Sequence, residues 1–494
     1  MFEWLSDRIG RFYCQLGEVT GIGATCHLLR ICGKTILIDF GVAISRKGEF
    51  QIQGVPAGNF LIGTPIDLII ITHAHLDHFG AIARFTRHHP ETKIIVSKSA
   101  LAAIAYMLAD SLHIMEGEIS TASRLGISLG EPLFTEQDRL NFLSNPNLIA
   151  VDLPSWLDTE KVLGKSWAEC RIGFPDSGHD IGAMMSFITD PLGRPYLVTG
   201  DVCSHDQIFI KGVMLPDKSF CGDFFDRPGL VMITEMTNGA KPMTETPEEI
   251  LVQLGKKLKE VSAKNGLALI AAFSKNRCSK MALACIQLGY VPFVDGSGRT
   301  MMRIELGSEV VDQLLKSGKL IFANEGAGKE NARIAKEQRA ALFNGEMGFH
   351  PYIAPSGTLQ GGHSVSAANI ILSGKNNAVI FPGYLFPDSI SKQIYDMTRG
   401  HTVVLDVWNN LRHRLVPTPV NVRCEVCHFD FTSHDKQERL VQGSVLAKPE
   451  ILICHHGDEQ AFTAYPEALL GRYAELNMPA PRIERGGHLK TIQF

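Results

Sequence analysis

The sequence predicts an α/β protein in which one domain is inserted into another. The chain has 494 residues, which is more than a single hydrophobic core usually holds. Short β-runs separated by glycine turns fill the first part, helices alternate with strands from about residue 242, and β-runs return after about residue 401. A β-rich segment that resumes after an α/β segment indicates an insertion. We therefore expect one domain at 1–238 and 401–494, and the inserted domain at 239–400.

The composition is that of a globular protein without low-complexity tracts. Hydrophobic residues make up 45% of the chain and charged residues 20%. The formal net charge of −4 does not favour a dedicated nucleic-acid binder, so any positive field has to be local. The 11 cysteines are scattered, residues 1–14 lack the layout of a secretory signal, and no apolar stretch is long enough to span a bilayer. We expect a cytoplasmic protein with no membrane partner, and the sequence leaves a homodimer open.

The strongest chemical motif, His73-Ala-His75-Leu-Asp77-His78, follows a predicted buried strand. Residues 67–72 are a dense β-branched run, which is typical of such a strand, and a helical pattern follows the motif. A turn at this place can direct His73 and His75 at one metal ion, and Asp77 and His78 at a second. Imidazole and carboxylate groups are ligands of catalytic zinc sites, which keep a position open for water. A histidine-rich surface loop or a simple helix cap does not account for the full spacing.

Single carboxylates also follow predicted strands further along the chain. A strand at 35–38 ends at Asp39, a strand at 196–199 is followed by Asp201, and a third predicted strand is followed by Glu235. Each of these alone is a weak signal, because Gly-Asp after a strand is most often a turn. Taken singly, therefore, none of these carboxylates identifies a site.

The middle of the chain has a different pattern. A helix is predicted at 246–265, a strand at 267–273 and a helix at 279–288. Further strands are predicted at 352–354 and 378–381. Alternation of this kind is typical of βαβ units, so we expect a parallel sheet in the inserted domain.

The stretch Thr72-His73-Ala-His75-Leu-Asp77-His78-Phe-Gly80 resembles the signature of the metallo-β-lactamase superfamily. The resemblance implies a metallo-β-lactamase αββα sandwich. It also implies roles for three residues outside the stretch. Asp39 matches the aspartate that supports the zinc-binding loop, His179 matches the histidine of the third superfamily motif, and Asp201 matches the metal-bridging aspartate.

The α/β segment resembles the β-CASP insertion, which caps the active site in the nucleic-acid-processing members of this superfamily. Glu235 matches the acidic motif at which that family begins the cap, His434 its second motif, and His456 the zinc ligand of its third motif. The turn at Ser356 and Gly357 matches the Ser-Gly-rich turn of the cap, which can offer hydroxyl and backbone N–H groups to phosphate.

The same resemblance implies two Zn²⁺ ions per chain. His455 is a rival of His456 as a ligand, and the following Gly457 favours His456. Two zinc ions lower the pKa of water to roughly 7, so a hydroxide that they activate can attack phosphorus. By family position, the ligands are His73, His75 and His179 for one ion, Asp77, His78 and His456 for the other, and Asp201 for both. Asp77, Glu235 and His434 are the expected catalytic residues, with His434 as the proton donor and Glu235 as the group that orients it.

The histidine of the third β-CASP motif also separates the branches of that family. RNA-processing members carry histidine there, as His456 does, whereas DNA-processing members generally carry valine. We therefore expect a zinc-dependent ribonuclease whose partner is single-stranded RNA. The alternatives are a DNA nuclease or a small-ester hydrolase of the same fold, and an inactive partner subunit in an RNA-processing complex. Departures from the family pattern, such as Asp435 after His434, indicate a divergent member, and endo- versus exonucleolytic action stays open.

Overall fold

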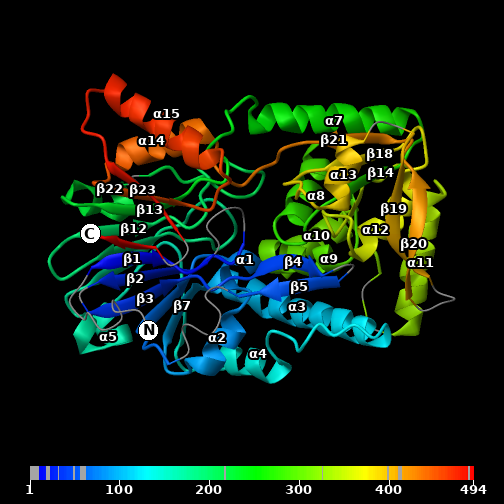
Figure 1. Ribbon diagram of the computed structural model, residues 1–494. Coiled ribbons are helices and arrows are strands. Elements are labelled where there is room, and N and C mark those ends of the chain that lie inside the picture. The colour runs from blue at the N-terminus through cyan, green and yellow to red at the C-terminus, as the bar shows by residue number, and fades with distance from the viewer. Residues whose placement is uncertain are drawn as a thin grey trace. The chain divides into compact units, whose positions relative to one another are not determined.

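The computed structural model describes residues 11–17, 23–31, 33–47, 50–55, 63–215, 218–324, 326, 328–397, 400–409, 414–487 and 490–494. The chain divides into two compact units, whose elements are labelled in Figure 1. The first unit comprises Met1–Asp206, Ile210–Met243 and Ser433–Phe494, and the second comprises Gln207–Phe209 and Thr244–Thr432.

Two β-sheets form the centre of the first unit in the described part of the chain. The strands of one sheet lie in the order β24 (Thr491–Gln493), β1 (Phe12–Gln15), β2 (His27–Ile31), β3 (Lys34–Ile38), β6 (Leu68–Ile71), β7 (Lys93–Ser97) and β8 (Leu148–Val151). The strands of the other lie in the order β23 (Arg482–Arg485), β22 (Ile451–His455), β13 (Val231–Glu235), β12 (Pro195–Val198), β11 (Ser186–Thr189), β10 (Arg171–Phe174) and β9 (Ser155–Trp156). A separate hairpin pairs β4 (Ala43–Lys47) with β5 (Phe50–Gly54).

The two sheets pack face to face through a shared hydrophobic core. Leu68 and Ile70 of β6 belong to the same buried cluster as Val198 of β12 and Ile233 of β13. Successive residues of a strand point to opposite faces, and every side chain of β6 is buried, so this strand is covered on both sides. The buried strand predicted at 67–72 is thereby confirmed, with its observed bounds at Leu68–Ile71.

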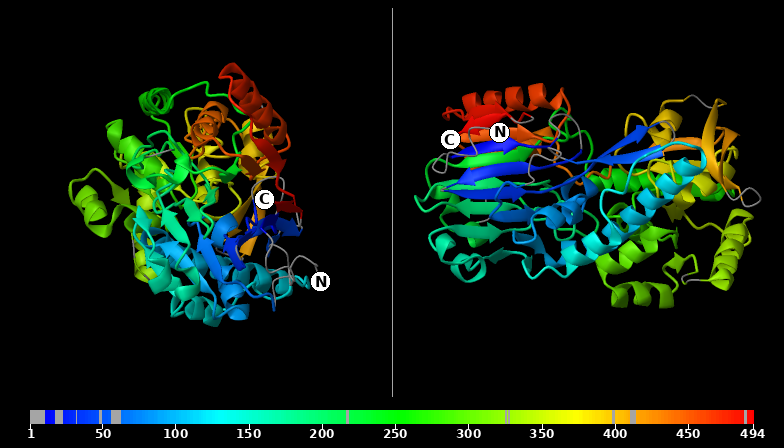
Figure 2. Two further views of the ribbon diagram at one scale, coloured as in Figure 1. Left: turned by 90° about the vertical axis from the view of Figure 1, so that its left-hand side faces the viewer. Right: turned by 60° about the horizontal axis from the view of Figure 1, so that its bottom comes forward.

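Helices cover the outer faces of both sheets (Figure 2). α14 (Gln437–Ala447) and α15 (Ala461–Glu475) pack on the second sheet through a buried cluster that includes Leu440 and Tyr465. α3 (Lys98–Arg124) packs against β7 and β8 of the first sheet. The other helical segments of the unit are α1 (Leu76–Phe79), α2 (Ile82–His88), α4 (Glu136–Leu143), α5 (Thr159–Leu163), η3 (Lys165–Trp167), α6 (Lys218–Cys221) and η4 (Phe224–Asp226). The first unit is therefore an αββα sandwich, as predicted.

Parallel strands bring the predicted site residues to one edge of each sheet. β3 is parallel to β6, and β13 is parallel to both β12 and β22. The carboxyl ends of parallel strands lie at the same edge of a sheet. The residues at or just after these strand ends are Asp39, His73, Asp201, Glu235 and His456.

The second unit contains a parallel sheet between helices. Its strands lie in the order β16 (Ile321–Phe322), β15 (Phe293–Val294), β17 (Tyr352–Ala354), β14 (Ala268–Ala271), β18 (Ala378–Phe381) and β21 (Glu425–His428), and these described neighbours pair in parallel. The helices are α7 (Pro247–Ala263), α8 (Arg277–Gln287), α9 (Ser297–Leu306), α10 (Ser308–Lys316), α11 (Lys329–Phe343), α12 (Gly362–Ile371) and α13 (Ile390–Asp396). The predicted parallel sheet is confirmed.

The second unit extends further along the chain than the expected range of 239–400. It ends at Thr432, because β21 pairs with β18 and completes the parallel sheet. The hairpin of β19 (Thr402–Asn409) and β20 (Arg414–Asn421) also belongs to it, since Val403 and Leu405 are buried in the same cluster as Val365 of α12. The strands expected at 403–407 and 420–428 therefore lie in the second unit and not in the return segment of the first. No helix within the described ranges is both long and apolar enough to cross a membrane.

Candidate metal centre

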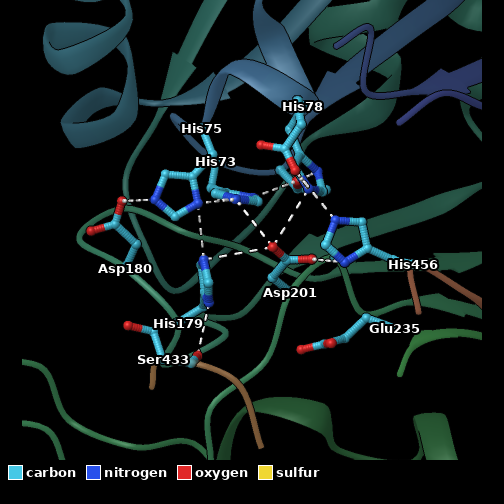
Figure 3. Close-up of polar contacts among 12 residues, drawn as sticks. His73, His75, His78, His179, Asp180, Asp201, Glu235, Ser433 and His456 are labelled. Atoms are coloured by element: carbon cyan, nitrogen blue, oxygen red, sulfur yellow. Dashed lines mark hydrogen bonds and ion pairs between the residues drawn. The ribbon is translucent and has the colours of Figure 1, made fainter. Parts of the chain in front are cut away.

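Side chains from the strand ends of the first unit form clusters of potential metal ligands. Among the described residues, one cluster consists of His73, His75, His179 and Asp201, and another of Asp77, His78 and His456. Within each cluster, one ligand atom of every residue lies within 4.8 Å of the others. The structure thus brings together all the residues predicted as metal ligands, and Figure 3 shows the two clusters meeting at Asp201.

The first cluster forms where the turn after β6 meets the loop that carries His179. His75 Nδ1 lies 3.0 Å from His73 Nε2 and 3.2 Å from His179 Nε2. Asp201 follows β12 and places Oδ2 at 3.4 Å from His73 Nε2 and 3.6 Å from His179 Nε2. Three imidazole nitrogens and a carboxylate oxygen at these distances have the composition and spacing of a metal-binding shell.

The second cluster joins α1 to the turn after β22. Asp77 Oδ2 lies 3.3 Å from His456 Nε2 and 3.6 Å from His78 Nε2. Asp201 Oδ2 is also 3.5 Å from His78 Nε2, so this carboxylate lies between the two clusters. A carboxylate that contacts both clusters lies where a ligand that bridges two metal ions would be expected.

Four of the five histidines in the two clusters are held through Nδ1, whereas Nδ1 of His75 faces the centre. His78 Nδ1 donates to the carboxylate of Asp39 at 2.7 Å, and His179 Nδ1 donates to the carbonyl of Ser433 at 2.8 Å. Metal-ligating histidines are typically oriented by such contacts, which leave Nε2 for the metal. Hydroxyl groups contact Nδ1 of two further histidines in the same way. Thr72 Oγ1 lies 3.0 Å from His73 Nδ1, and Thr237 Oγ1 lies 2.9 Å from His456 Nδ1.

Two buried polar atoms at the junction of the clusters test whether a metal fits. His78 Nε2 and Asp201 Oδ1 are buried and form no hydrogen bond with any described residue. A buried polar atom left without a partner costs about 1–3 kcal/mol. A metal ion between His78 and Asp201 would remove that cost, and imidazole with carboxylate is a donor set that binds zinc. The residues present therefore fit a metal centre.

Burial and neighbouring carboxylates act in opposite directions on the imidazoles. Burial lowers the pKa of His73 and of His179 well below the usual value, and the adjacent imidazoles lower it further. Burial also opposes protonation of His78, but the carboxylates around it, first Asp201, outweigh burial and raise its pKa to about 10. Neutral imidazole is the form that binds a metal. The carboxylates supply a negative field that favours a cation beside His78.

Glu235 and His434, the predicted catalytic pair, form a third group with Asp201. His434 Nδ1 donates to Glu235 Oε1 at 2.8 Å, and His434 Nε2 lies 4.0 Å from Asp201 Oδ2. Glu235 is fully buried and also accepts hydrogen bonds from the backbone N–H groups of Val202 and Thr237. Burial would raise the pKa of Glu235, but the imidazole of His434 outweighs it and lowers that pKa to about 2. The ionised carboxylate therefore holds the His434 ring with Nε2 toward Asp201.

The structure separates the two rival histidines after β22. The side chain of His456 lies in the second cluster, and its backbone φ of 56° turns the chain out of the strand direction. His455 instead packs edge-on against His27, with ring centroids 4.2 Å apart. The geometry therefore favours His456 over His455 as the ligand.

Ser356 and Gly357 belong to the second unit, whereas both metal-ligand clusters lie in the first. They begin the turn between β17 and α12. Ser356 Oγ accepts a hydrogen bond from the backbone N–H of Thr358 at 3.1 Å. A Cβ added at Gly357 would lie 3.1 Å from the ring of Phe273, so this position has little room for a side chain. The predicted contact of this turn with phosphate stays a prediction.

Apart from Asp39, the groups that orient the predicted ligand histidines were not predicted from the sequence. Thr72, Thr237 and the Ser433 carbonyl all serve in this way. Thr72 and Ser433 each immediately precede a histidine of the predicted site, and Thr237 lies two residues after Glu235. This proximity was the available signal, but a threonine or serine beside a motif is too common to be assigned without coordinates.

Comparisons with known proteins agree with this geometry. A model of the metallo-beta-lactamase superfamily matches residues 19–133. The "Probable RNase MJ4" of Methanocaldococcus jannaschii is 22% identical over 456 residues, covering 90% of this chain and 92% of that protein. The "Ribonuclease TTHA0252" of Thermus thermophilus is 24% identical over 477 residues, covering 93% and 96%.

Longer proteins and a solved structure also match along nearly the whole chain. The "Cleavage and polyadenylation specificity factor subunit 3-I" of Arabidopsis thaliana is 22% identical over 480 residues, and this chain spans 61% of its length. A crystal structure of a protein of unknown function from Enterococcus faecalis V583 shares the fold, with a TM-score of 0.58, 13% identity, and coverage of 98% of this chain and all of that one. The predicted fold class is confirmed. Residues 19–133 of the chain thus match the metallo-beta-lactamase superfamily, and the distant relatives matched along nearly the whole chain bear the names RNase, ribonuclease and cleavage and polyadenylation specificity factor subunit.

Proposed function

We propose that this protein is a zinc-dependent phosphodiesterase that hydrolyses single-stranded RNA. The observation that carries the proposal is the position of Asp201, whose Oδ2 lies within 3.6 Å of His73, His78 and His179 and so joins the two ligand clusters. Relatives matched over nearly their whole length bear the names RNase and ribonuclease, which supports RNA as the substrate.

The ligand assignment follows the two clusters. His73, His75 and His179 would hold one zinc ion, Asp77, His78 and His456 a second, and Asp201 would contact both. A bound zinc pair supplies Lewis acidity, which lowers the pKa of water to roughly 7 and neutralises charge on a phosphate. Two buried atoms that could bind a metal, His78 Nε2 and Asp201 Oδ1, form no hydrogen bond with any described residue, which supports this assignment.

The chain's own residues supply the proton transfer. Cleavage of a phosphodiester leaves an alkoxide oxygen on the ribose, which needs a proton as the bond to phosphorus breaks. His434 presents Nε2 toward Asp201 and is the donor in this proposal. Glu235 accepts the Nδ1 proton of His434 in a 2.8 Å hydrogen bond, so it holds the tautomer and the ring orientation. Glu235 therefore acts as a positioning residue.

A polymeric substrate is favoured over a small ester by the size of the second unit. This unit forms its own parallel sheet between helices, which the hydrolysis of a small ester would not need. In the proposal, Ser356 and Gly357 offer hydroxyl and backbone N–H groups to a phosphate of the strand. The turn that contains them lies between β17 and α12, and the N–H of Ser356 already donates to the Gly361 carbonyl at 3.3 Å, so the proposal assigns the backbone contact to Gly357.

Cleavage of end-labelled oligonucleotides tests the proposal. The full-length protein is incubated with single-stranded RNA and DNA of the same sequence, with and without a chelator, beside the variants Asp77→Ala and Asp67→Ala. Asp67 is a half-buried carboxylate that accepts a hydrogen bond from Thr35 and lies outside every ligand cluster among the described residues, so it is the matched control.

The expected result is RNA cleavage that the chelator and Asp77→Ala abolish and that Asp67→Ala retains. Internal fragments would assign endonucleolytic cleavage. Release of mononucleotides would assign exonucleolytic cleavage. Cleavage of DNA alone would overturn the choice of substrate. A wild-type protein that carries zinc but cleaves neither nucleic acid would overturn the enzymatic assignment in favour of an inactive partner subunit.

A further inference from the structure

A group of metal-ligating side chains that contains a thiol lies in the first unit, apart from the clusters described above. It consists of Cys203, His205 and Asp435, whose ligand atoms lie within 4.8 Å of one another. Cys203 Sγ is 3.4 Å from His205 Nδ1, and Asp435 Oδ1 is 3.6 Å from the same nitrogen. None of the three belongs to the proposed catalytic centre, so the group needs its own explanation.

The distances within this group match those of zinc ligands. Zinc binds thiolate sulfur at about 2.3 Å and imidazole nitrogen or carboxylate oxygen at about 2.0–2.2 Å, in tetrahedral geometry. Two such ligands therefore lie roughly 3.3–3.6 Å apart. The Sγ–Nδ1 distance of 3.4 Å and the Nδ1–Oδ1 distance of 3.6 Å both agree with this spacing.

The backbone holds the three ligands in place. A Cβ added at Gly178 would lie 2.1 Å from the carbonyl oxygen of Cys203, and one added at Gly212 would lie 2.4 Å from the carbonyl carbon of His205. Glycine is thus required on both sides of the segment that carries Cys203 and His205. Ser204 joins this segment to the one that carries Asp435, because its N–H and Oγ donate to Asp435 Oδ1 at 2.8 and 2.9 Å. These contacts hold the segment of Cys203 and His205 beside Asp435.

A catalytic Cys-His-Asp arrangement is the competing interpretation, and the geometry disfavours it. In such an arrangement, one ring nitrogen of the histidine faces the thiol and the other faces the carboxylate. Here Nδ1 and Nε2 of His205 lie 3.4 and 3.5 Å from Cys203 Sγ, so neither ring nitrogen is directed at the thiol alone, and Nδ1 also faces Asp435 Oδ1 at 3.6 Å. Cys203 is moreover fully buried, so a substrate cannot reach its sulfur.

We propose that Cys203, His205 and Asp435 bind a further transition-metal ion, with zinc as the natural occupant. Thiolate, imidazole and carboxylate together suit zinc better than magnesium or calcium, which prefer oxygen ligands alone. Three protein ligands leave one tetrahedral position to water, so the ion should exchange more readily than an ion with four protein ligands. Cys203 lies two residues after Asp201, and Asp435 follows His434, so a bound ion would tie the two turns that carry those residues.

Cobalt substitution provides a test that the catalytic centre cannot imitate. The ligand clusters of the proposed catalytic centre contain no cysteine among the described residues, so only a thiolate site yields the near-ultraviolet sulfur-to-cobalt charge-transfer band. Metal-free full-length protein is titrated with Co²⁺, beside Cys203→Ser, Asp77→Ala and Cys170→Ser. Cys170 is a buried cysteine outside every such group of the described residues and serves as the matched control.

The proposal expects the band in the wild type, in Asp77→Ala and in Cys170→Ser, and its loss in Cys203→Ser. With Zn²⁺ in excess, Cys203→Ser should bind one ion fewer per chain than the wild type. RNA cleavage is measured in a separate experiment. Absence of the band from the wild type, or its persistence in Cys203→Ser, would overturn the proposal. Because Cys203 is buried, His205→Ala provides a second variant at a more exposed side chain, and it too must lose the band. Retention of the band by folded His205→Ala would count against the site.

Discussion

Asp39 accepts a hydrogen bond from Nδ1 of His78 across 2.7 Å, although 39 residues separate them in the sequence. The same carboxylate accepts hydrogen bonds from the backbone N–H and the hydroxyl of Thr72 at 2.7 and 2.8 Å. One buried side chain therefore holds both the start of the His73 turn and the ring of His78, a predicted ligand. β3 and β6 pair in parallel, which places the end of one strand beside the end of the other.

Replacement of Asp39 by asparagine should weaken metal binding without removing a ligand. The introduced amide can no longer offer two carboxylate oxygens, so the tautomer and orientation of His78 would be less well fixed. Loss of such a supporting group typically costs 10- to 100-fold in metal affinity. Competition with a chromophoric chelator measures the zinc affinity of Asp39→Asn, with Asp67→Asn as the control. An unchanged affinity in folded Asp39→Asn would show that the His78 contact does not support the metal.

His434→Ala should separate chemistry from metal binding. Loss of a general acid typically lowers turnover by about 10²- to 10⁴-fold. His434 Nε2 lies 4.0 Å from Asp201 and the residue is absent from both main ligand clusters, so zinc content should stay at the wild-type value. The measurements are RNA cleavage under single-turnover conditions and zinc by elemental analysis, with the exposed His113→Ala as the control. Loss of zinc in His434→Ala would reassign His434 as a ligand.

Gly41→Ala should disturb the metal centre through the backbone. A Cβ at Gly41 would lie 1.6 Å from the carbonyl oxygen of Asp77, which accepts a hydrogen bond from Thr25 N–H at 2.7 Å. The added methyl group must displace the Asp77 peptide, and forced overpacking typically costs about 1–3 kcal/mol. We expect a lower unfolding temperature and less bound zinc.

An exposed helical glycine provides the contrast to Gly41. Gly117 lies on α3 with no other atom within 4 Å of an added Cβ, so Gly117→Ala should stabilise the protein by about 0.5–1 kcal/mol. Thermal unfolding and zinc content are compared for both variants. Wild-type zinc content and stability in Gly41→Ala would mean that the backbone at Asp77 can move without loss of the site.

The predicted ligands came together because each stands beside a strong local pattern. His73 and Asp77 follow a β-branched strand, and Asp201 and His456 follow strands that are parallel to β13. A strand's hydrophobic run is readable from the sequence, and in a parallel sheet its carboxyl end is also the site edge. Local pattern and topology therefore carry the same information at these positions.

Features that depend on pairing between distant segments could not be predicted. β21 is a short strand of sequence Glu-Val-Cys-His, and only its pairing with β18 assigns it to the second unit. Asp435 lies 231 residues from Ser204, so no local motif joins it to the segment of Cys203. The long helix α3 is a different case, because its buried residues Ile104, Leu108 and Leu112 recur at the spacing of one helix face, a signal that is present in the sequence although this helix was not predicted.

The second unit contains a buried carboxylate whose ionisation should make stability depend on pH. Asp295 follows β15, and its Oδ2 accepts hydrogen bonds from the hydroxyl of Tyr352 at 2.7 Å and from Arg339 at 2.9 Å. Burial alone would raise the pKa of Asp295, but these donors and His363 outweigh it and hold that pKa below the ordinary value of 3.8. The folded protein therefore keeps Asp295 ionised at a pH at which the unfolded chain would bind a proton.

The sign of the effect follows from this lowered pKa. A carboxylate with a depressed folded pKa stabilises the protein fully above its unfolded pKa of about 4, and the contribution is lost as the pH falls through the folded value. Asp295→Asn should therefore be less stable than the wild type at pH 7, and the difference should shrink below about pH 4. Amide hydrogen exchange of β15 and β17 peptides in the full-length protein measures this locally, with the exposed Asp396→Asn as the control. A difference between wild type and Asp295→Asn that is the same at pH 7 and pH 3 would show that the ionised form of Asp295 does not provide the stability.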